Sequence, residues 1–414
     1  MHRTIVVLAV ALATSSAWAK DFVNPDQIVY DHVPGFGPQG GTEILEWERK
    51  SAPGSGEPAV TASIDAQSGL RLRWLGAAGF EISDDQTSIL VDPFVSRPTA
   101  LQGLFPLDID TEAVDKYVID PMMRKGSFKN LKAILVSHTH IDHVQDVPYI
   151  LSRFPKIADR PLVAGDRNLA CLLKAYNGRE KSIAWLKGAD VLSSTRQQIF
   201  DFNEKKKLNP PPNQKLGIAV VGSFGKFTIT AFISEHGLYD DLIFTLEGTL
   251  RGKVPLTGLQ YPAYLNSSMT YLIEYNTGSG AAGDPKRALR LFLADSARFL
   301  NGQRVITEVL QGGPVDLLLE GIAARKKKNG IPQKIDGFNP RYFVPTHFDD
   351  FFVPLDQFQN FDFEIEATGS DNARLKEFIL QDFPSSCGAT ACPKLRMMKM
   401  FYYYSLEKLL TREG

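Results

Sequence analysis

One short stretch constrains this chain more than any other part of it: residues 135–143, with the sequence LVSHTHIDH. The apolar run 133–136 is typical of a buried strand, and the six positions 138–143 that follow Ser137 carry three imidazoles and one carboxylate. The whole chain has only seven histidines in 414 residues. Imidazole nitrogens and carboxylate oxygens are ligands that Zn²⁺ prefers, so the stretch predicts a metal site. The alternative is an ordinary polar loop after a strand.

The same stretch resembles the motif of a known family. The pattern His-x-His-x-Asp-His after a strand is the hallmark of the metallo-β-lactamase superfamily, and here it is complete as His138, His140, Asp142 and His143. The resemblance implies an α/β fold, the four-layer αββα sandwich, with a centre of two divalent metal ions. Zinc is the first expectation for these ions, with Mn²⁺ and iron as alternatives.

Four more polar residues follow predicted strands in the same way. They are Asp92, His236, Asp295 and His347, and each comes just after an apolar run. Ligands at the same end of successive strands meet at one edge of a sheet, the usual place for an α/β active site. Together with the first motif, this arrangement uses five of the seven histidines.

The resemblance also implies a role for each of these residues. The first ion would be held by His138, His140 and His236, and the second by Asp142, His143 and His347. Asp295 would bridge the ions, and Asp142 and Asp295 are the carboxylates expected to take part in catalysis. Asp92 would support the metal-binding loop without binding metal, unless it is only a turn residue at a strand end.

The sequences around Trp74 and His347 narrow the resemblance to one branch of the family. The sequence Trp-Leu-Gly at 74–76, before a strand that ends in Asp92-Pro93, is similar to the branch of ascorbate-6-phosphate lactonases and N-acyl-phosphatidylethanolamine phospholipases. The context Pro-x-His-Phe around His347 points the same way. One departure is visible, because the family often has glycine two or three residues after the last histidine of the motif. Here Gln145 and Asp146 follow, which would narrow the floor of the pocket.

The reaction implied by the resemblance is hydrolysis. A hydroxide between the two metals would attack an ester, lactone or phosphoester bond of a small-molecule or lipid-derived substrate. The alternatives are a phosphodiesterase that acts on lipid headgroups, like phospholipase D, and a metal-binding protein without turnover. No Gly-x-Ser-x-Gly sequence suggests a serine nucleophile. The formal net charge of −1 argues against an enzyme that binds nucleic acid.

The N-terminus is expected to be an export signal. Residues 1–19 combine a positive start, an apolar stretch and a small-x-small site, so cleavage is predicted after Ala19, with release to the periplasm or the exterior. The alternative is an uncleaved anchor. No later stretch is long and apolar enough for a transmembrane helix.

The remaining chain divides into three parts. Residues 20–69 predict an extended Gly- and Pro-rich arm, residues 70–360 the hydrolase domain, and residues 361–414 a C-terminal extension packed on that domain. In this extension Cys387 and Cys392 are expected to form a disulfide that closes a small loop. Cys171 lies in an apolar segment and is expected to be a buried thiol.

Overall fold

The computed structural model describes residues 69–99, 101–154, 156, 159–177, 197–200, 218–236, 268–276, 288–295, 297–298, 302–322, 330–349, 351–355, 382–383, 392–396, 398, 400–401 and 403–406. The predicted signal peptide 1–19, nearly all of the arm 20–69, and Cys387 lie outside these residues.

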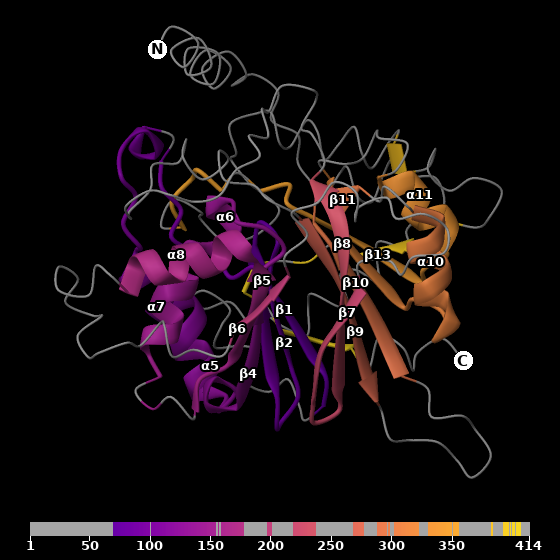
Figure 1. The fold of residues 1–414 in the computed structure, drawn as a ribbon, viewed down its shortest axis with the longest axis horizontal. Coiled ribbons are helices and arrows are strands. Elements are labelled where there is room, and N and C mark those ends of the chain that lie inside the picture. Colours follow the sequence, from indigo (N-terminus) through magenta and orange to yellow (C-terminus); the bar gives the residue numbers. More distant parts are fainter. Residues whose placement is uncertain are drawn as a thin grey trace, which may run out of the picture.

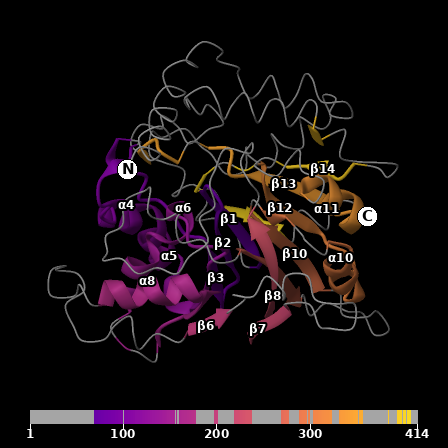
Figure 2. The same ribbon diagram turned by 45° about the horizontal axis from the view of Figure 1, so that its top comes forward.

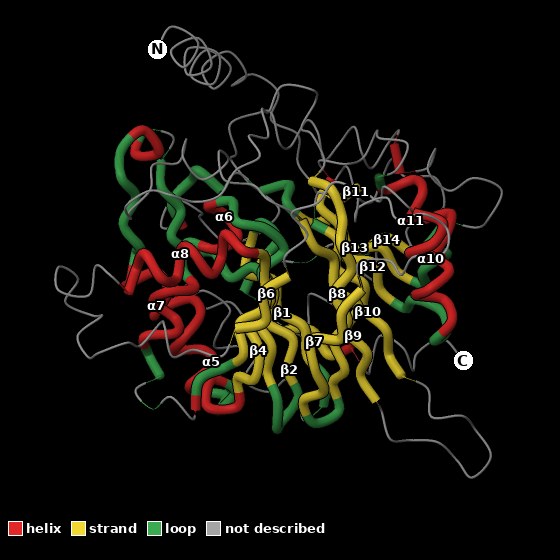
Figure 3. The backbone as a smooth tube through the Cα atoms, in the orientation of Figure 1, coloured by secondary structure: helices red, strands yellow, loops and turns green. Residues whose placement is uncertain are grey.

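The described residues form two mixed β-sheets that stack face to face, with helices on the outer face of each sheet (Figure 1). The turned view shows α4, α5 and α8 on one flank and α10 and α11 on the other (Figure 2). Figure 3 shows the same layering, with strands in the middle and helices outside. This is the αββα sandwich that the sequence predicted, and the prediction of the fold class is confirmed.

The first sheet has the strand order β15-β1-β2-β3-β4-β5-β6. Its strands are β1 (Arg71–Gly76), β2 (Gly79–Ser83), β3 (Ser88–Val91), β4 (Leu131–Leu135), β5 (Leu162–Asp166), β6 (Gln197–Phe200) and β15 (Tyr403–Ser405). The pairs from β15 to β3 are antiparallel, and the pairs from β3 to β6 are parallel.

The second sheet has the order β11-β8-β9-β10-β12-β13-β14, and β7 also pairs with β8. Its strands are β7 (Ile218–Phe224), β8 (Phe227–His236), β9 (Ser268–Asn276), β10 (Ala288–Ala294), β11 (Ala297–Arg298), β12 (Leu317–Gly321), β13 (Tyr342–Thr346) and β14 (Lys394–Leu395). Strands β10, β12, β13 and β14 run parallel to one another, so β10, β12 and β13 carry their C-terminal ends to the same edge.

The helical segments are short. They are η2 (Gln102–Leu104), α4 (Thr111–Val114), η3 (Asp115–Ile119), α5 (Asp120–Arg124), η4 (Phe128–Asn130), α6 (Ile141–Val144), α7 (Val147–Ser152), α8 (Arg167–Asn177), α10 (Gly302–Gln311) and α11 (Ile331–Phe338). Within the described part of the chain, no helix is both long and apolar enough to cross a membrane.

Apolar runs become strands because a sheet covered on both faces buries every side chain along them. β3 is buried throughout, and β4 is buried except for Lys132. The predicted strands over 88–91 and 133–136 are confirmed, the second beginning two residues earlier and ending one residue earlier than the sequence indicated.

β1 departs from its sequence pattern. Its alternation of apolar and polar residues predicts one exposed face, yet all six residues are buried. Arg73 is fully buried and lies 2.6 Å from the carboxylate of Glu81, and its guanidinium also lies over the ring of Tyr403. The Nη1 of Arg73 also donates to the carbonyl of Tyr117 in η3, at 3.2 Å. Helical segment η3 therefore lies against the face that the pattern would leave in solvent, while β15 extends the sheet at its edge.

The C-terminal extension contributes a strand to each sheet. β15 pairs with β1 at the edge of the first sheet, and β14 pairs with β13 at the edge of the second. Cys392, just before β14, is disulfide-bonded. Its expected partner, Cys387, lies outside the described residues, so the pairing stays a prediction.

Candidate metal centre

The loop after β4 is held first by Asp92, at the end of the neighbouring strand β3. Its backbone N–H donates to the carbonyl of Leu135 at 2.9 Å, and its Oδ1 accepts the N–H of Ser137 at 2.7 Å. Asp92 has a φ of +42°, in the left-handed region that aspartate adopts more readily than most residues. Asp92 therefore lies behind the loop and contacts its backbone, and its supporting role at the metal site stays a prediction.

Strand β9 holds the same loop from the opposite sheet. The N–H of Met269 donates to the carbonyl of Ser137 at 2.8 Å, and the hydroxyl of Tyr271 donates to the carbonyl of Val136 at 2.7 Å. Because both sheets bind the backbone of this loop, its position is fixed before any metal is present.

The three histidines of the motif are buried close together. His138 Nε2 lies 3.1 Å from His140 Nδ1, and the rings of His138 and His143 have centroids 3.9 Å apart. His140 begins the short helix α6, and Asp142 and His143 lie in that helix. The short helix therefore brings the ring of His143 back against that of His138, which lies in the extended residues before it.

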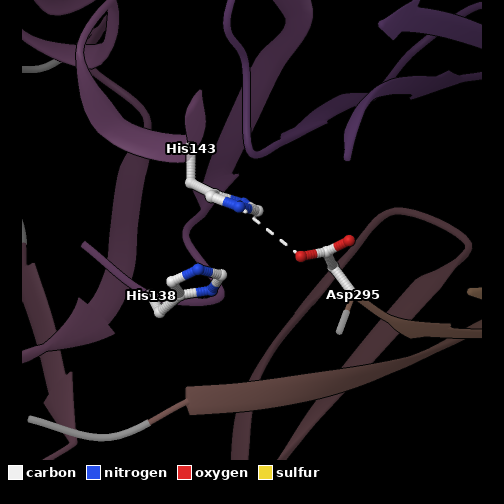
Figure 4. Close-up of side chains that lie close together, drawn as sticks. All are labelled: His138, His143 and Asp295. Carbon is white, nitrogen blue, oxygen red and sulfur yellow. Dashed lines mark ion pairs between the residues drawn. The ribbon is translucent and has the colours of Figure 1, made fainter. Parts of the chain in front are cut away.

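Two residues from the second sheet meet this cluster. Asp295, just after β10, has its Oδ2 3.4 Å from Nε2 of His143. His347, just after β13, has its Nε2 2.7 Å from Oδ2 of Asp142, which itself lies 3.2 Å from Nε2 of His143. Figure 4 shows Asp295 facing His143, with the ring of His138 beside them. Parallel strands that end at one edge therefore bring together residues far apart in the sequence.

The side chains form two groups that could each hold a metal ion. His138, His143 and Asp295 make one, and Asp142, His143 and His347 make the other. Within each group the potential ligand atoms all lie within 4.8 Å of one another. His143 belongs to both groups, whereas the sequence assigned it to the second ion alone.

His236 is the remaining predicted ligand. Its backbone ends β8 and pairs with Ala297 of β11, two residues after Asp295. The strand register therefore places it at the edge where the other residues meet; its side chain lies outside the described residues, so its role as a ligand stays a prediction.

A comparison with models of protein families agrees with a metal centre at these residues. The family model described as "Metallo-beta-lactamase superfamily" matches residues 75–229, which include Asp92 and the complete His-x-His-x-Asp-His motif. Over these residues the chain is similar to the metallo-β-lactamase superfamily. A search of curated protein sequences gives no significant match.

Solved structures with similar folds include other proteins of diverse activity. Igni18, a metallo hydrolase from the archaeon Ignicoccus hospitalis, is 14% identical; the match covers 80% of this chain and 95% of that one, with a TM-score of 0.39. CmlA, a diiron β-hydroxylase from Streptomyces venezuelae, is 14% identical over 80% of this chain and 53% of its own, with a TM-score of 0.41. The short form of human tRNase Z is 11% identical over 81% of this chain and 98% of its own, with a TM-score of 0.40.

The metallo-β-lactamase fold implies divalent metal binding, and the donor atoms of this chain fit that expectation. Among the described residues, both carboxylate oxygens of Asp295 are buried without a hydrogen-bond partner, and Oδ2 has only the ion pair with Nε2 of His143 at 3.4 Å. Leaving such atoms unsatisfied in a protein interior costs free energy. A divalent cation would satisfy carboxylate oxygens and an imidazole nitrogen at once, so the residues fit a metal ion.

At the histidines of the candidate site, burial and neighbouring negative charges shift the pKa in opposite directions. Burial favours neutral imidazole at His143, but the carboxylates of Asp142 and Asp92 outweigh it and hold the pKa of His143 well above its usual value. At His347 burial is again outweighed, chiefly by the charge of Asp295 and the hydrogen bond to Asp142, and the pKa is raised to about 9. At His140 burial prevails and lowers the pKa to about 4.

The pKa values of the two carboxylates, Asp142 and Asp295, also depend on burial and on neighbouring charges. Burial would raise the pKa of Asp142, but the charge and hydrogen bond of His143 outweigh it and hold that pKa well below its usual value. At Asp295 burial dominates and raises the pKa. The metal-free centre therefore holds protons on His143 and His347 between carboxylates, and a metal ion would replace those protons.

Asp146 is one residue whose role the sequence did not predict. Its Oδ2 accepts the N–H groups of Val95 at 2.5 Å and Ser96 at 3.0 Å. It thus ties the end of the metal-binding motif to the loop after β3. The only signal in the sequence was the departure itself, an acidic residue where the superfamily often has glycine.

Proposed function

We propose that the protein is an exported, metal-dependent hydrolase with two divalent ions, zinc in the first place, that cleaves an ester, lactone or phosphoester bond. The observation that carries the proposal is the meeting of Asp295 and His347 with the His-x-His-x-Asp-His motif. It creates two groups of buried donor atoms that share His143. Export rests on the signal-like residues 1–19, and the lactonase and phospholipase branch on the sequences around Trp74 and His347.

When bound, two divalent ions would lower the pKa of a water molecule and neutralise negative charge that develops on the substrate. The chain's own residues prepare the site for them. The Oδ2 of Asp92 lies 3.1 Å from Nδ1 of His143, which fixes the orientation of that ring and leaves Nε2 facing the cluster. The hydroxyl of Ser137 lies 3.3 Å from the same Nδ1 and supports this orientation.

The two carboxylates assigned to the reaction flank the same nitrogen. Nε2 of His143 lies 3.2 Å from Asp142 Oδ2 and 3.4 Å from Asp295 Oδ2. In the metal-free protein a proton on this nitrogen is held between two negative groups. The same negative charges would offset part of the charge of two dications, and either carboxylate can accept the proton that an activated water releases.

The decisive experiment measures metal content and hydrolysis on the same purified chain, after residues 1–19 have been removed. We expect two divalent ions per chain, and hydrolysis of a generic bis-aryl phosphodiester or a generic γ-lactone that a chelator abolishes and added zinc restores. The ratio of the two activities assigns the bond type. Full metal content without hydrolysis of either compound would identify a metal-binding protein without turnover. A chain that binds no divalent ion would show the proposal to be wrong.

A further inference from the structure

The backbone of Ala77, in the turn between β1 and β2, is bound on both sides by the segment that carries His347. Its N–H donates to both carboxylate oxygens of Asp349, at 3.0 and 2.9 Å. Its carbonyl accepts the N–H of His347 at 3.1 Å. The backbone of one residue of the first sheet therefore binds the segment at the end of β13 in the second sheet at two points.

Both residues joined by this contact have an unusual backbone. Ala77 has a φ of +43° and His347 a φ of +55°, in the left-handed region where a residue with a Cβ is strained. Such a conformation persists only where the surroundings impose it. The hydrogen bonds of Asp349 and His347 to Ala77 are the contacts that impose it here.

Arg97, in the loop after β3, contacts the same carboxylate of Asp349. Its guanidinium Nη2 forms a buried ion pair with Asp349 Oδ2, and the two side chains are fully buried. The same Nη2 lies 3.4 Å from the sulfur of Met400, in the C-terminal extension. The carboxylate of Asp349 is thus bound by Ala77 and Arg97, and it is not among the atoms of the two candidate metal groups.

Gly76 shows how closely these groups approach the chain. It has a φ of +94°, and a Cβ built on it would lie 2.9 Å from Met400 Sδ and closer still to Arg97 Nη2. Real Cβ atoms do not come so near, so a side chain at this position would displace Arg97. The turn has room for the ion pair only because residue 76 is glycine.

We propose that Asp349, acting through Ala77 and Arg97, is a positioning residue that holds His347 in its metal-binding orientation. We call Asp349, Arg97 and Ala77 the Ala77 clamp. The inference rests on the proposed two-metal function and deepens it. Because His347 belongs to the group with Asp142 and His143, the clamp governs the ion held by that group. The group of His138, His143 and Asp295 does not contain His347.

The test compares Asp349→Asn with Glu81→Gln. Each variant neutralises the carboxylate of a fully buried ion pair with arginine, Arg97 in one case and Arg73 in the other. Glu81 contacts Arg73, Ser127 and Tyr403 and none of the candidate ligands. Both variants should melt at a lower temperature than the unchanged protein. Competition with a chromophoric chelator then measures how many zinc ions each chain binds and how tightly.

We expect Glu81→Gln to keep two tight ions, as in the unchanged chain. Asp349→Asn should keep one tight ion and bind the other about 10- to 100-fold more weakly, the usual effect of removing the support of a metal ligand. A cobalt-substituted sample should show the loss in the absorption of one of two sites. Equal metal binding by the two variants would overturn the inference, whether both keep two tight ions or both lose affinity to the same extent.

A second pair of variants covers the case in which Asp349→Asn does not fold. Gly76→Ala and Gly313→Ala both add a Cβ at positive φ, +94° and +117°, but nothing lies within 4 Å of a Cβ at Gly313. Only Gly76→Ala should weaken one zinc ion, because only it displaces Arg97. Two tight ions in folded Gly76→Ala would contradict the clamp. Since the measurement is zinc binding, its result is separate from whether the protein hydrolyses any substrate.

Discussion

Nε2 of His347 lies 2.7 Å from Oδ2 of Asp142, although 205 residues separate the two along the chain. Strand β13 of the second sheet ends just before His347, and helix α6, in the loop after β4 of the first sheet, holds Asp142. The contact therefore exists only because the two sheets stack with their site-bearing edges together. The sequence predicted that these residues converge, and they do; the binding of a metal ion between them stays a prediction.

Replacing His347 tests that binding. His347→Ala removes one nitrogen donor from the group with Asp142 and His143, so we expect the chain to retain one ion instead of two. Hydrolysis should fall by several orders of magnitude, because the activation of water depends on the ions. Metal analysis and hydrolysis of the phosphodiester or lactone measure both effects. His32→Ala, a histidine outside the predicted site, is the control, and full metal and activity in His347→Ala would refute the two-metal site.

The two carboxylates Asp92 and Asp295 should behave differently. Asp295→Ala removes the carboxylate whose buried oxygens have no hydrogen-bond partner among the described residues, and should lower the metal content toward one ion. Asp92→Asn keeps an oxygen for the N–H of Ser137 but removes the charge beside Nδ1 of His143. It should keep both ions with an affinity about 10- to 100-fold lower. Equilibrium zinc titration separates the two outcomes, and the reverse order would exchange the roles assigned to these residues.

The positions of the site residues were predictable because each follows an apolar run. Such runs mark buried strands, and parallel strands that end together bring their next residues to one edge. Asp92, Asp295 and His347 were found in this way, from β3, β10 and β13. The partition of ligands between two ions was not predictable, because the sharing of His143 depends on the angle at which α6 leaves the loop.

Other features depend on tertiary contacts that no local pattern records. Strands β14 and β15 have two and three residues, too few for a period to show. Arg73 has the sequence context of an exposed residue. It is buried because Glu81, the carbonyl of Tyr117 and, from the end of the chain, the ring of Tyr403 surround its guanidinium. The hydrogen bonds of Asp146 and Asp349 likewise join segments distant in sequence, 51 and 272 residues apart.

Tyr271 gives a test of the link between the sheets. Tyr271→Phe removes the hydroxyl that donates to the carbonyl of Val136 and leaves that buried carbonyl with one partner fewer. The free energy of unfolding, measured by urea denaturation, should fall by about 1–3 kcal/mol. Zinc should also bind more weakly, because the residues after Val136 are candidate ligands. Tyr275→Phe, on the same strand and equally buried, should leave zinc affinity unchanged.

Asp146 should make the stability of the metal-free protein depend on pH. Burial raises the pKa of its carboxyl group from 3.8 to about 7. Between these two values the unfolded chain is ionised at this position while the folded protein keeps the proton. The folded state therefore binds more protons, and its stability falls as the pH rises from about 4 to about 7, by up to about 1.4 kcal/mol per pH unit. Above about pH 7 both states are ionised and this contribution no longer changes.

Asp146→Asn isolates that contribution from the other groups that titrate in the same range. The amide keeps an oxygen that can accept the N–H groups of Val95 and Ser96, but it has no proton to lose. We expect the variant to be more stable than the unchanged protein at about pH 7, with the difference shrinking toward about pH 4. Urea denaturation at a series of pH values, with a chelator present throughout, measures this difference. Asp120→Asn, which neutralises an exposed carboxylate, should keep the pH dependence of the unchanged chain. A difference between Asp146→Asn and the unchanged protein that stays constant over this range would show that Asp146 is ionised in the folded state.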